Sequence, residues 1–141
     1  MPRWERTVEI NTSPAHVWSV MAEVGKWPEW TASILSVEEV SPGFGLGGSA
    51  LVHAKGTPKS KYTVTRWEPG AGFNWQTRVR GASAIAGHWI EGAGEGRSRV
   101  TLSVEVRGPI AALLKPVLGR RFAPNIETEA QGLKRRCEAN T

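Results

Sequence analysis

The sequence contains no aspartate, and all 13 acidic residues of this 141-residue chain are glutamates. This excludes catalytic triads that use aspartate, aspartate nucleophiles and the aspartate-rich loops that bind calcium. There is one cysteine, Cys137, so the chain cannot form an internal disulfide, and nothing indicates an oxidising compartment. The three histidines, His16, His53 and His88, fall on separate predicted elements, which is not typical of metal ligands. We therefore expect no metal site and no cofactor.

Long apolar runs are also absent. No stretch approaches the roughly 18 residues that span a bilayer, and the N-terminal MPRWERTVEI lacks the apolar core of a signal peptide. We expect no stable membrane insertion and a cytoplasmic location. The net charge is +5, but the basic residues are scattered, with tight pairs only at Arg120–Arg121 and Arg135–Arg136. Because nucleic-acid binders concentrate charge in a stripe, we expect no nucleic-acid partner.

The first 30 residues predict one strand and two short helices. Alternating side chains in residues 3–10 predict the strand. A helix is predicted to start at Pro14, where the missing N–H costs nothing, and to stop at Gly25. Pro28 then opens a second short helix that carries Trp30.

The stretch KWPEW holds two tryptophans three positions apart. Exposed aromatic residues beside a basic groove would suit base stacking, but the neighbours here are Lys26 against Glu23 and Glu29. We therefore interpret Trp27 as a core residue, and Trp30 as a core residue that also walls one end of any internal cavity.

The rest of the chain predicts a sheet followed by a long helix. Residues 34–106 contain six short β-rich runs separated by turn signals, which indicates an antiparallel meander. After Gly108 apolar residues recur every three or four positions, so we predict a helix that Pro124 kinks or breaks. We interpret its apolar stripe as the side packed on the sheet, and Gly43–Gly48 and the Pro124 region as candidate gates. The chain is treated as one domain, residues 1–141.

These features resemble the START-like (Bet v 1-like, SRPBCC) superfamily, and within it the bacterial polyketide cyclase/dehydrase and lipid-transport group. The resemblance lies in VEINTSPAHVWSVMAEVGKWPEW, VTRWEPGAGFNWQ, GHWIEGAGEGRSRVTLSVEVRGPIAALL and EAQGLKRRCE, from Thr7 to about Glu138. It implies an α+β helix-grip fold. In this fold a curved antiparallel sheet wraps around the long C-terminal helix, two short helices follow the first strand, and a cavity takes an apolar ligand.

His88 is the candidate catalytic residue, because a histidine in the strand GHWIE is recurrent in the resembled group. From the cavity wall it could protonate or orient a ligand carbonyl. The alternative is a histidine hydrogen-bonded within the sheet or facing solvent. Strand alternation places Ile90 and the small Ala84 and Ala86 on the face of His88, which favours the cavity.

Binding or transport of a small hydrophobic molecule, lipid- or polyketide-like, is the first hypothesis, since the resemblance implies a cavity and the chain contains seven tryptophans. The second is an aromatase/cyclase- or dehydratase-like enzyme acting on a polyketide-type substrate, and the third is a regulatory or interaction module with a vestigial cavity. We expect a monomer or homodimer. The predicted ligand-binding residues are Trp30, Ile34, His53, Tyr62, Val64, Trp75, His88, Ile90, Leu114 and Leu118.

Overall fold

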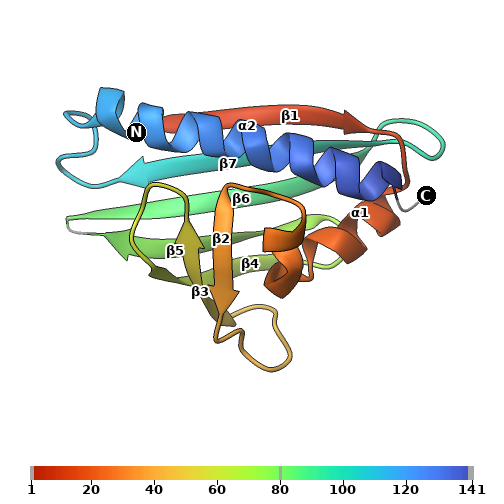
Figure 1. Cartoon of the computed structure of the whole chain (residues 1–141), viewed down its shortest axis with the longest axis horizontal. Coiled ribbons are helices and arrows are strands. Elements are labelled where there is room, and N and C mark those ends of the chain that lie inside the picture. Colours follow the sequence, from red (N-terminus) through yellow and green to blue (C-terminus); the bar gives the residue numbers. More distant parts are fainter. Residues whose placement is uncertain (1, 80, 140–141) are drawn as a thin grey trace.

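The computed structural model describes residues 2–79 and 81–139, and its elements follow the predicted order (Figure 1). The first strand is followed by a short α-helix, a short 3-10 helix, six strands and a long C-terminal helix. These elements are β1 (Arg3–Ile10), α1 (Pro14–Met21), η1 (Val24–Glu29), β2 (Ile34–Glu38), β3 (Ser49–Ala54), β4 (Ser60–Glu68), β5 (Gly72–Val79), β6 (Ala82–Gly92), β7 (Ser98–Arg107) and α2 (Lys115–Ala139). The predicted helix-grip α+β fold is thus confirmed.

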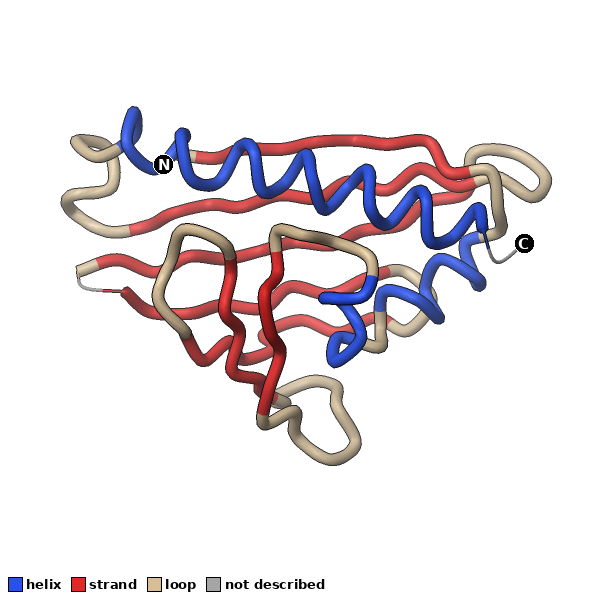
Figure 2. The backbone as a smooth tube through the Cα atoms, viewed as in Figure 1, coloured by secondary structure: helices blue, strands red, loops and turns tan. Residues whose placement is uncertain are grey.

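The seven strands form one antiparallel sheet in the order β1-β7-β6-β5-β4-β3-β2. Strands β2 to β7 pair with their neighbours in sequence, and β1 forms one edge of the sheet by pairing with β7 from Arg3↔Glu105 to Ile10↔Ser98. The register shifts between Ile34 and Ser36 in β2, and again between Val64 and Arg66 in β4. Such irregularities bend strands, and the sheet curls around one side of α2 (Figures 1 and 2).

The two short helices differ in detail from the prediction. Ser13 caps α1, and its hydroxyl accepts a hydrogen bond from the His16 backbone. The helix ends at Met21, before the predicted stop at Gly25, because Glu23 leaves the helical region of backbone space (φ −85°, ψ 70°). Pro28 lies inside η1 and does not open a helix of its own. The result is a tight turn that buries Trp27 (1% exposed) beneath α1.

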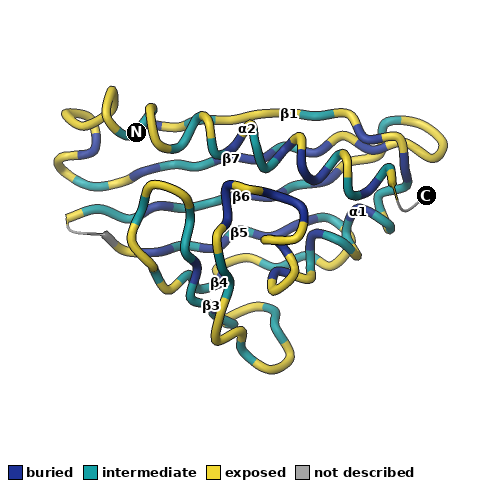
Figure 3. The backbone as a smooth tube through the Cα atoms, in the orientation of Figure 1, coloured by how far each residue is buried: buried dark blue, intermediate teal, exposed yellow. Residues whose placement is uncertain are grey.

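The long helix α2 is not broken at Pro124, contrary to one of the two predicted outcomes. A proline inside a helix removes one backbone hydrogen bond. Tertiary packing compensates for this lost hydrogen bond, because the helical turns after Pro124 bury one face on the sheet (Figure 3). The buried residues of α2 are Ile126, Ala130, Gly132, Leu133 and Cys137.

Four large apolar residues before that buried face are exposed, so their interpretation as part of a stripe packed on the sheet was wrong. Ile110, Leu113, Leu114 and Val117 are 41% to 80% exposed. Residues 109–114 form turns, and α2 begins only at Lys115, so the helical periodicity does not extend over this stretch. Among the described residues, no helix is long and apolar enough to cross a membrane.

One glycine allows α2 to approach the segment that follows η1. A Cβ atom added to Gly132 would lie 2.1 Å from the carbonyl oxygen of Trp30 and 3.3 Å from the Thr31 Cα. These obstacles are backbone atoms, so a side chain could be accommodated only by moving the helix or the segment. The absence of a side chain at Gly132 therefore determines how closely α2 packs against the segment after η1.

We expect Gly132→Ala to lower the free energy of unfolding by about 1–3 kcal/mol, the usual cost of overpacking. On an exposed helix the same change would instead stabilise the protein by about 1 kcal/mol. Urea denaturation followed by far-UV circular dichroism measures the difference. Gly92→Ala is the matched control, because nothing lies within 4 Å of a Cβ placed there. Equal stabilities for the two variants would contradict the close approach.

Candidate functional site

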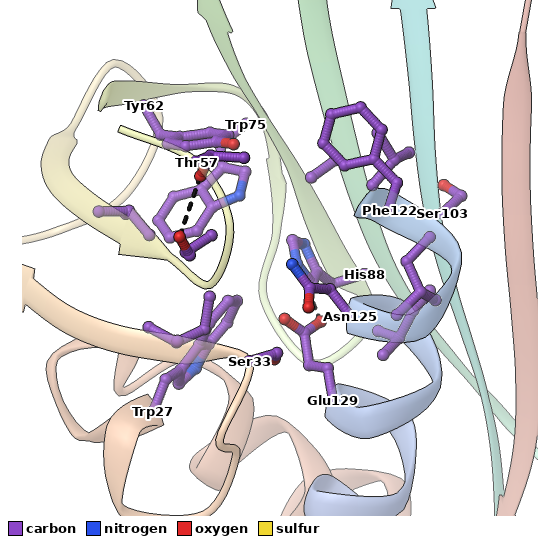
Figure 4. Close-up of a pocket in the computed structure, with 17 residues that line it drawn as sticks. Trp27, Ser33, Thr57, Tyr62, Trp75, His88, Ser103, Phe122, Asn125 and Glu129 are labelled. Atoms are coloured by element: carbon purple, nitrogen blue, oxygen red, sulfur yellow. Dashed lines mark hydrogen bonds and ion pairs between the residues drawn. The ribbon is translucent and has the colours of Figure 1, made fainter. Parts of the chain in front are cut away.

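A cavity of about 70 Å³ lies between the curved sheet and α2 (Figure 4). Most of its wall is apolar, and polar side chains reach it from β4, β6, β7, α2 and the turns beside β2 and β3. The lining residues are Trp27, Ser33, Ile34, Val52, Ala54, Thr57, Tyr62, Trp75, Ala86, His88, Leu102, Ser103, Val104, Phe122, Asn125, Ile126 and Glu129.

The side chains of His88 from β6 and Glu129 from α2 point toward each other in this cavity (Figure 4). The His88 Nε2 atom lies 3.8 Å from a Glu129 carboxyl oxygen, and the two side chains are 4% and 14% exposed. This distance is longer than a hydrogen bond. The imidazole stacks on Phe73, with ring centroids 4.5 Å apart, and Trp27 packs against it at 5.0 Å. The ring is therefore held by aromatic contacts rather than by the carboxyl group.

Burial favours the uncharged form of both groups. It lowers the pKa of His88 to about 4, although a hydrogen bond with the Phe73 carbonyl acts in the opposite direction. It raises the pKa of Glu129 to about 8. Near neutral pH the cavity thus holds a neutral imidazole beside a protonated carboxyl group.

The backbone contact of His88 defines which nitrogen carries the proton. The Nδ1 atom lies 3.4 Å from the Phe73 carbonyl oxygen, which can only accept, so Nδ1 is the donor. The Nε2 atom is then left with a free lone pair on the side of Glu129. A hydrogen-bond acceptor on His88 and a donor on Glu129 consequently lie side by side in an apolar wall.

Tyr62, which is partly buried, is the third ionisable group whose pKa the cavity shifts. Its ring packs against Trp75, with centroids 5.1 Å apart. Burial, reinforced by the nearby Glu129, raises the pKa of Tyr62 to about 12, so its hydroxyl stays protonated and available as a donor. The site therefore contains several neutral hydrogen-bonding groups and keeps its fixed charges outside.

The predicted ligand-binding residues divide into two groups in the structure. Four of them line the cavity: Ile34, Tyr62, Trp75 and His88. The other six are not among its lining residues: Trp30, His53, Val64, Ile90, Leu114 and Leu118. Val64 and Ile90 are buried in the core, and Leu114 is 41% exposed on the short turn before α2. A ligand-contacting role for either group stays a prediction.

Of the tryptophan pair in KWPEW, Trp27 and not Trp30 lines the cavity. Trp27 donates its indole N–H to the Met21 carbonyl at 3.0 Å, which turns its ring inward. The Trp30 ring packs against the Trp27 ring at 5.7 Å and lines a separate surface pocket with His16 and Arg136. Both residues belong to the buried core, as expected, but the cavity wall expected of Trp30 is formed by Trp27.

Glu129 is the functional candidate that sequence reasoning missed. It lies three residues after Ile126 and four before Leu133, both of which are buried. Helical spacing thus places this glutamate on the apolar face of α2. A glutamate on an otherwise apolar helix face was the sequence signal that could have identified Glu129 as a site residue.

Helix α2 meets the loop after β3 beside the cavity, and we call this junction, which two hydrogen bonds hold together, the mouth. Arg121 donates to the Gly56 carbonyl and Asn125 to the Lys55 carbonyl, each at 2.9 Å. The predicted gate at Gly43–Gly48 contributes no cavity-lining residue, and its Phe44 packs on Trp67 with ring centroids 5.7 Å apart. The α2 region around Pro124, the other predicted gate, does adjoin the mouth.

Across residues 2–79 and 81–139, no group of three or more histidine, cysteine or acidic side chains could hold a metal ion.

Comparison with known proteins agrees with this architecture. Residues 1–138 match the model of the family described as polyketide cyclase / dehydrase and lipid transport. The chain belongs to this family. An uncharacterised protein of Mycobacterium tuberculosis is 28% identical over 136 residues, which cover 87% of this chain and 81% of that protein.

Solved structures show how widely the fold of this polyketide cyclase/dehydrase family member is shared. The Zhui aromatase/cyclase from a Streptomyces species has a TM-score of 0.81 at 14% identity, covering 98% of this chain and 94% of that one. A norcoclaurine synthase of Thalictrum scores 0.77 at 12% identity, with coverage of 98% and 94%. A START superfamily protein of Mycobacterium smegmatis scores 0.74 at 14% identity, with 99% of both chains covered. At these identities the likeness establishes the fold.

The buried carboxyl group makes stability depend on pH. The folded state keeps a proton on Glu129 up to a pKa of about 8, whereas a glutamate ordinarily loses it near 4.5. The free energy of unfolding should therefore fall as pH rises from 4.5 to 8, by at most about 1.4 kcal/mol per unit from this group. His88 opposes this trend only below its ordinary value of 6.5. The effect of Glu129 is thus clearest between pH 7 and 8.

Urea denaturation at several pH values tests this prediction, with Glu129→Gln expected to flatten the slope between pH 7 and 8. Glu127→Gln is the control, since that carboxylate is 49% exposed and pairs with Arg6. Identical slopes for the wild type and Glu129→Gln would show that Glu129 is ionised in the folded protein.

Proposed function

We propose that the protein binds a small hydrophobic molecule in the cavity between the sheet and α2. The observation that carries this proposal is a largely apolar internal cavity whose buried polar groups are held neutral. Such a site solvates an uncharged ligand oxygen without placing a charge in the wall. The family description, which names polyketide cyclases and lipid transport, supports the same class of ligand.

The size of the cavity limits what can bind without movement. Its volume of about 70 Å³ exceeds what a few water molecules need, while pockets for drug-sized ligands enclose roughly 300–1,000 Å³. A lipid- or polyketide-sized ligand therefore requires α2 and the loop after β3 to separate. The two hydrogen bonds from Arg121 and Asn125 are the contacts that this opening would break.

A cytoplasmic site of action, with the one cysteine buried and reduced, is part of the proposal.

Filling the cavity should abolish binding. Ala86→Phe places a ring in the cavity wall, whereas Ile85→Phe places the same ring on the opposite face of β6. We expect Ala86→Phe to weaken binding of the neutral fluorophore N-phenyl-1-naphthylamine at least tenfold, and Ile85→Phe to leave it unchanged. Fluorescence titration measures both, with circular dichroism as the check on folding. Absence of probe binding to the wild type would contradict the proposal and favour a module with a vestigial cavity.

An enzymatic role is the second candidate, and the facing His88 and Glu129 specifically favour it. A neutral imidazole with a free Nε2 lone pair can accept a proton from carbon, and a protonated carboxyl group 3.8 Å away can donate one to a carbonyl oxygen. Proton transfers of this kind underlie cyclisation and dehydration of carbonyl compounds. The names of two structural neighbours, an aromatase/cyclase and a synthase, are consistent with this role.

Exchange of the α-protons of 2-tetralone for deuterium, followed by NMR, tests this role without knowledge of the natural substrate. We expect His88→Gln and Glu129→Gln each to slow the protein-catalysed exchange by about 100-fold, a common contribution of a positioned acid or base. His53→Gln is the control, because His53 does not line the cavity. Exchange no faster than in buffer would exclude this chemistry and leave the binding role intact.

A further inference from the structure

A second pocket of about 500 Å³ lies outside the cavity, between the loop after β3 and the N-terminal half of α2. We call it the vestibule. Its lining residues are Ala32, Ser33, Lys55, Gly56, Arg120, Arg121, Pro124, Asn125 and Thr128. Ser33 and Asn125 also line the cavity, so the two spaces share a wall and meet at the mouth.

The vestibule is strongly cationic. Three of its lining residues, Lys55, Arg120 and Arg121, carry positive charge, and none of its lining residues is acidic. The sequence contains no acidic residue between Glu105 and Glu127. Glu127, the acidic residue of α2 next in sequence, forms an ion pair with Arg6 of β1. The positive charge at the mouth is therefore not neutralised by the residues that form it.

Two of the three cations are available to a ligand. Arg121 is engaged with the Gly56 carbonyl oxygen. The side chains of Lys55 and Arg120 are exposed, and within the described part of the chain neither forms an ion pair or a hydrogen bond. Cations placed at the mouth of an apolar cavity attract anions and can hold a carboxylate or phosphate without being buried themselves.

We propose that the vestibule binds the anionic group of an amphipathic organic acid whose apolar end occupies the cavity. The inference rests on the proposed binding function and specifies its ligand class. The cavity with its neutral His88, Tyr62 and Glu129 suits only the uncharged part of such a molecule, because a carboxylate beside them would be desolvated without a counter-charge. Lys55 and Arg120 supply that counter-charge in the vestibule, beside the mouth of the cavity.

The test compares 4-phenylbutyrate with 4-phenylbutan-1-ol, which differ in charge but share the phenyl end. Isothermal titration calorimetry at low salt should show the acid binding at least tenfold more tightly than the alcohol. In Lys55→Ala/Arg120→Ala this preference should fall to near unity, with binding of the alcohol unchanged. Added salt should reduce the preference in the wild type, because exposed charges are screened.

The control variant Arg97→Ala/Arg135→Ala removes the same charge from exposed positions outside the vestibule, and it should keep the full preference for the acid. An equal loss in this control would mean that net charge causes the preference, which overturns the inference. Equal affinity of the wild type for both probes also overturns it and leaves cavity binding standing. Failure of both probes to bind contradicts the proposed function itself and the vestibule with it.

Discussion

The packing of α2 into the curved sheet is the contact on which the site depends. It buries Ile126, Ala130, Leu133 and Cys137, and the absence of a side chain at Gly132 allows the helix to reach the backbone of Trp30. The same approach brings Glu129 opposite His88, and the desolvation that results holds both groups neutral. The cavity, its mouth and the protonation states of His88 and Glu129 are thus consequences of the packing of α2 on the sheet. Any change that shifts α2 is expected to alter all three together.

The site combines an apolar interior with a charged exterior. Inside, the aromatic rings of Trp27 and Phe73 hold the imidazole, and no counter-ion is needed because the imidazole is uncharged. Outside, Lys55 and Arg120 lie in water beside the mouth. This division avoids a large desolvation penalty, since burying an unpaired charge costs far more free energy than leaving it in water. It also separates two tasks: the interior selects by shape and hydrogen bonding, and the exterior by charge.

Element order, the meander of neighbouring strands from β2 to β7 and the face of β6 on which His88 lies follow from patterns within single segments, and they could be predicted. Period-two alternation in β7 and helical spacing in α2 leave little choice of structure. Other features depend on contacts between distant segments. That Trp27 rather than Trp30 reaches the cavity follows from one hydrogen bond to Met21, and the approach at Gly132 follows from the path of the chain after η1. Glu129 could have been recognised from its place on the apolar face of α2, because its spacing from Ile126 and Leu133 is local information.

The pairing of β1 with β7 has a consequence for how the protein is made. The first strand is synthesised early, but its partner from Ser98 to Glu105 follows about 90 residues later. Further contacts then join Asn11 to Glu138 and Glu9 to Lys134, near the end of the chain. Until the ribosome has delivered these segments, β1 remains an unpaired edge, which is a common starting point for aggregation. Pairing of β1 into the sheet is therefore a late event, and truncation of the last turns of α2 would remove the contacts that Lys134 and Glu138 make at the end of this strand.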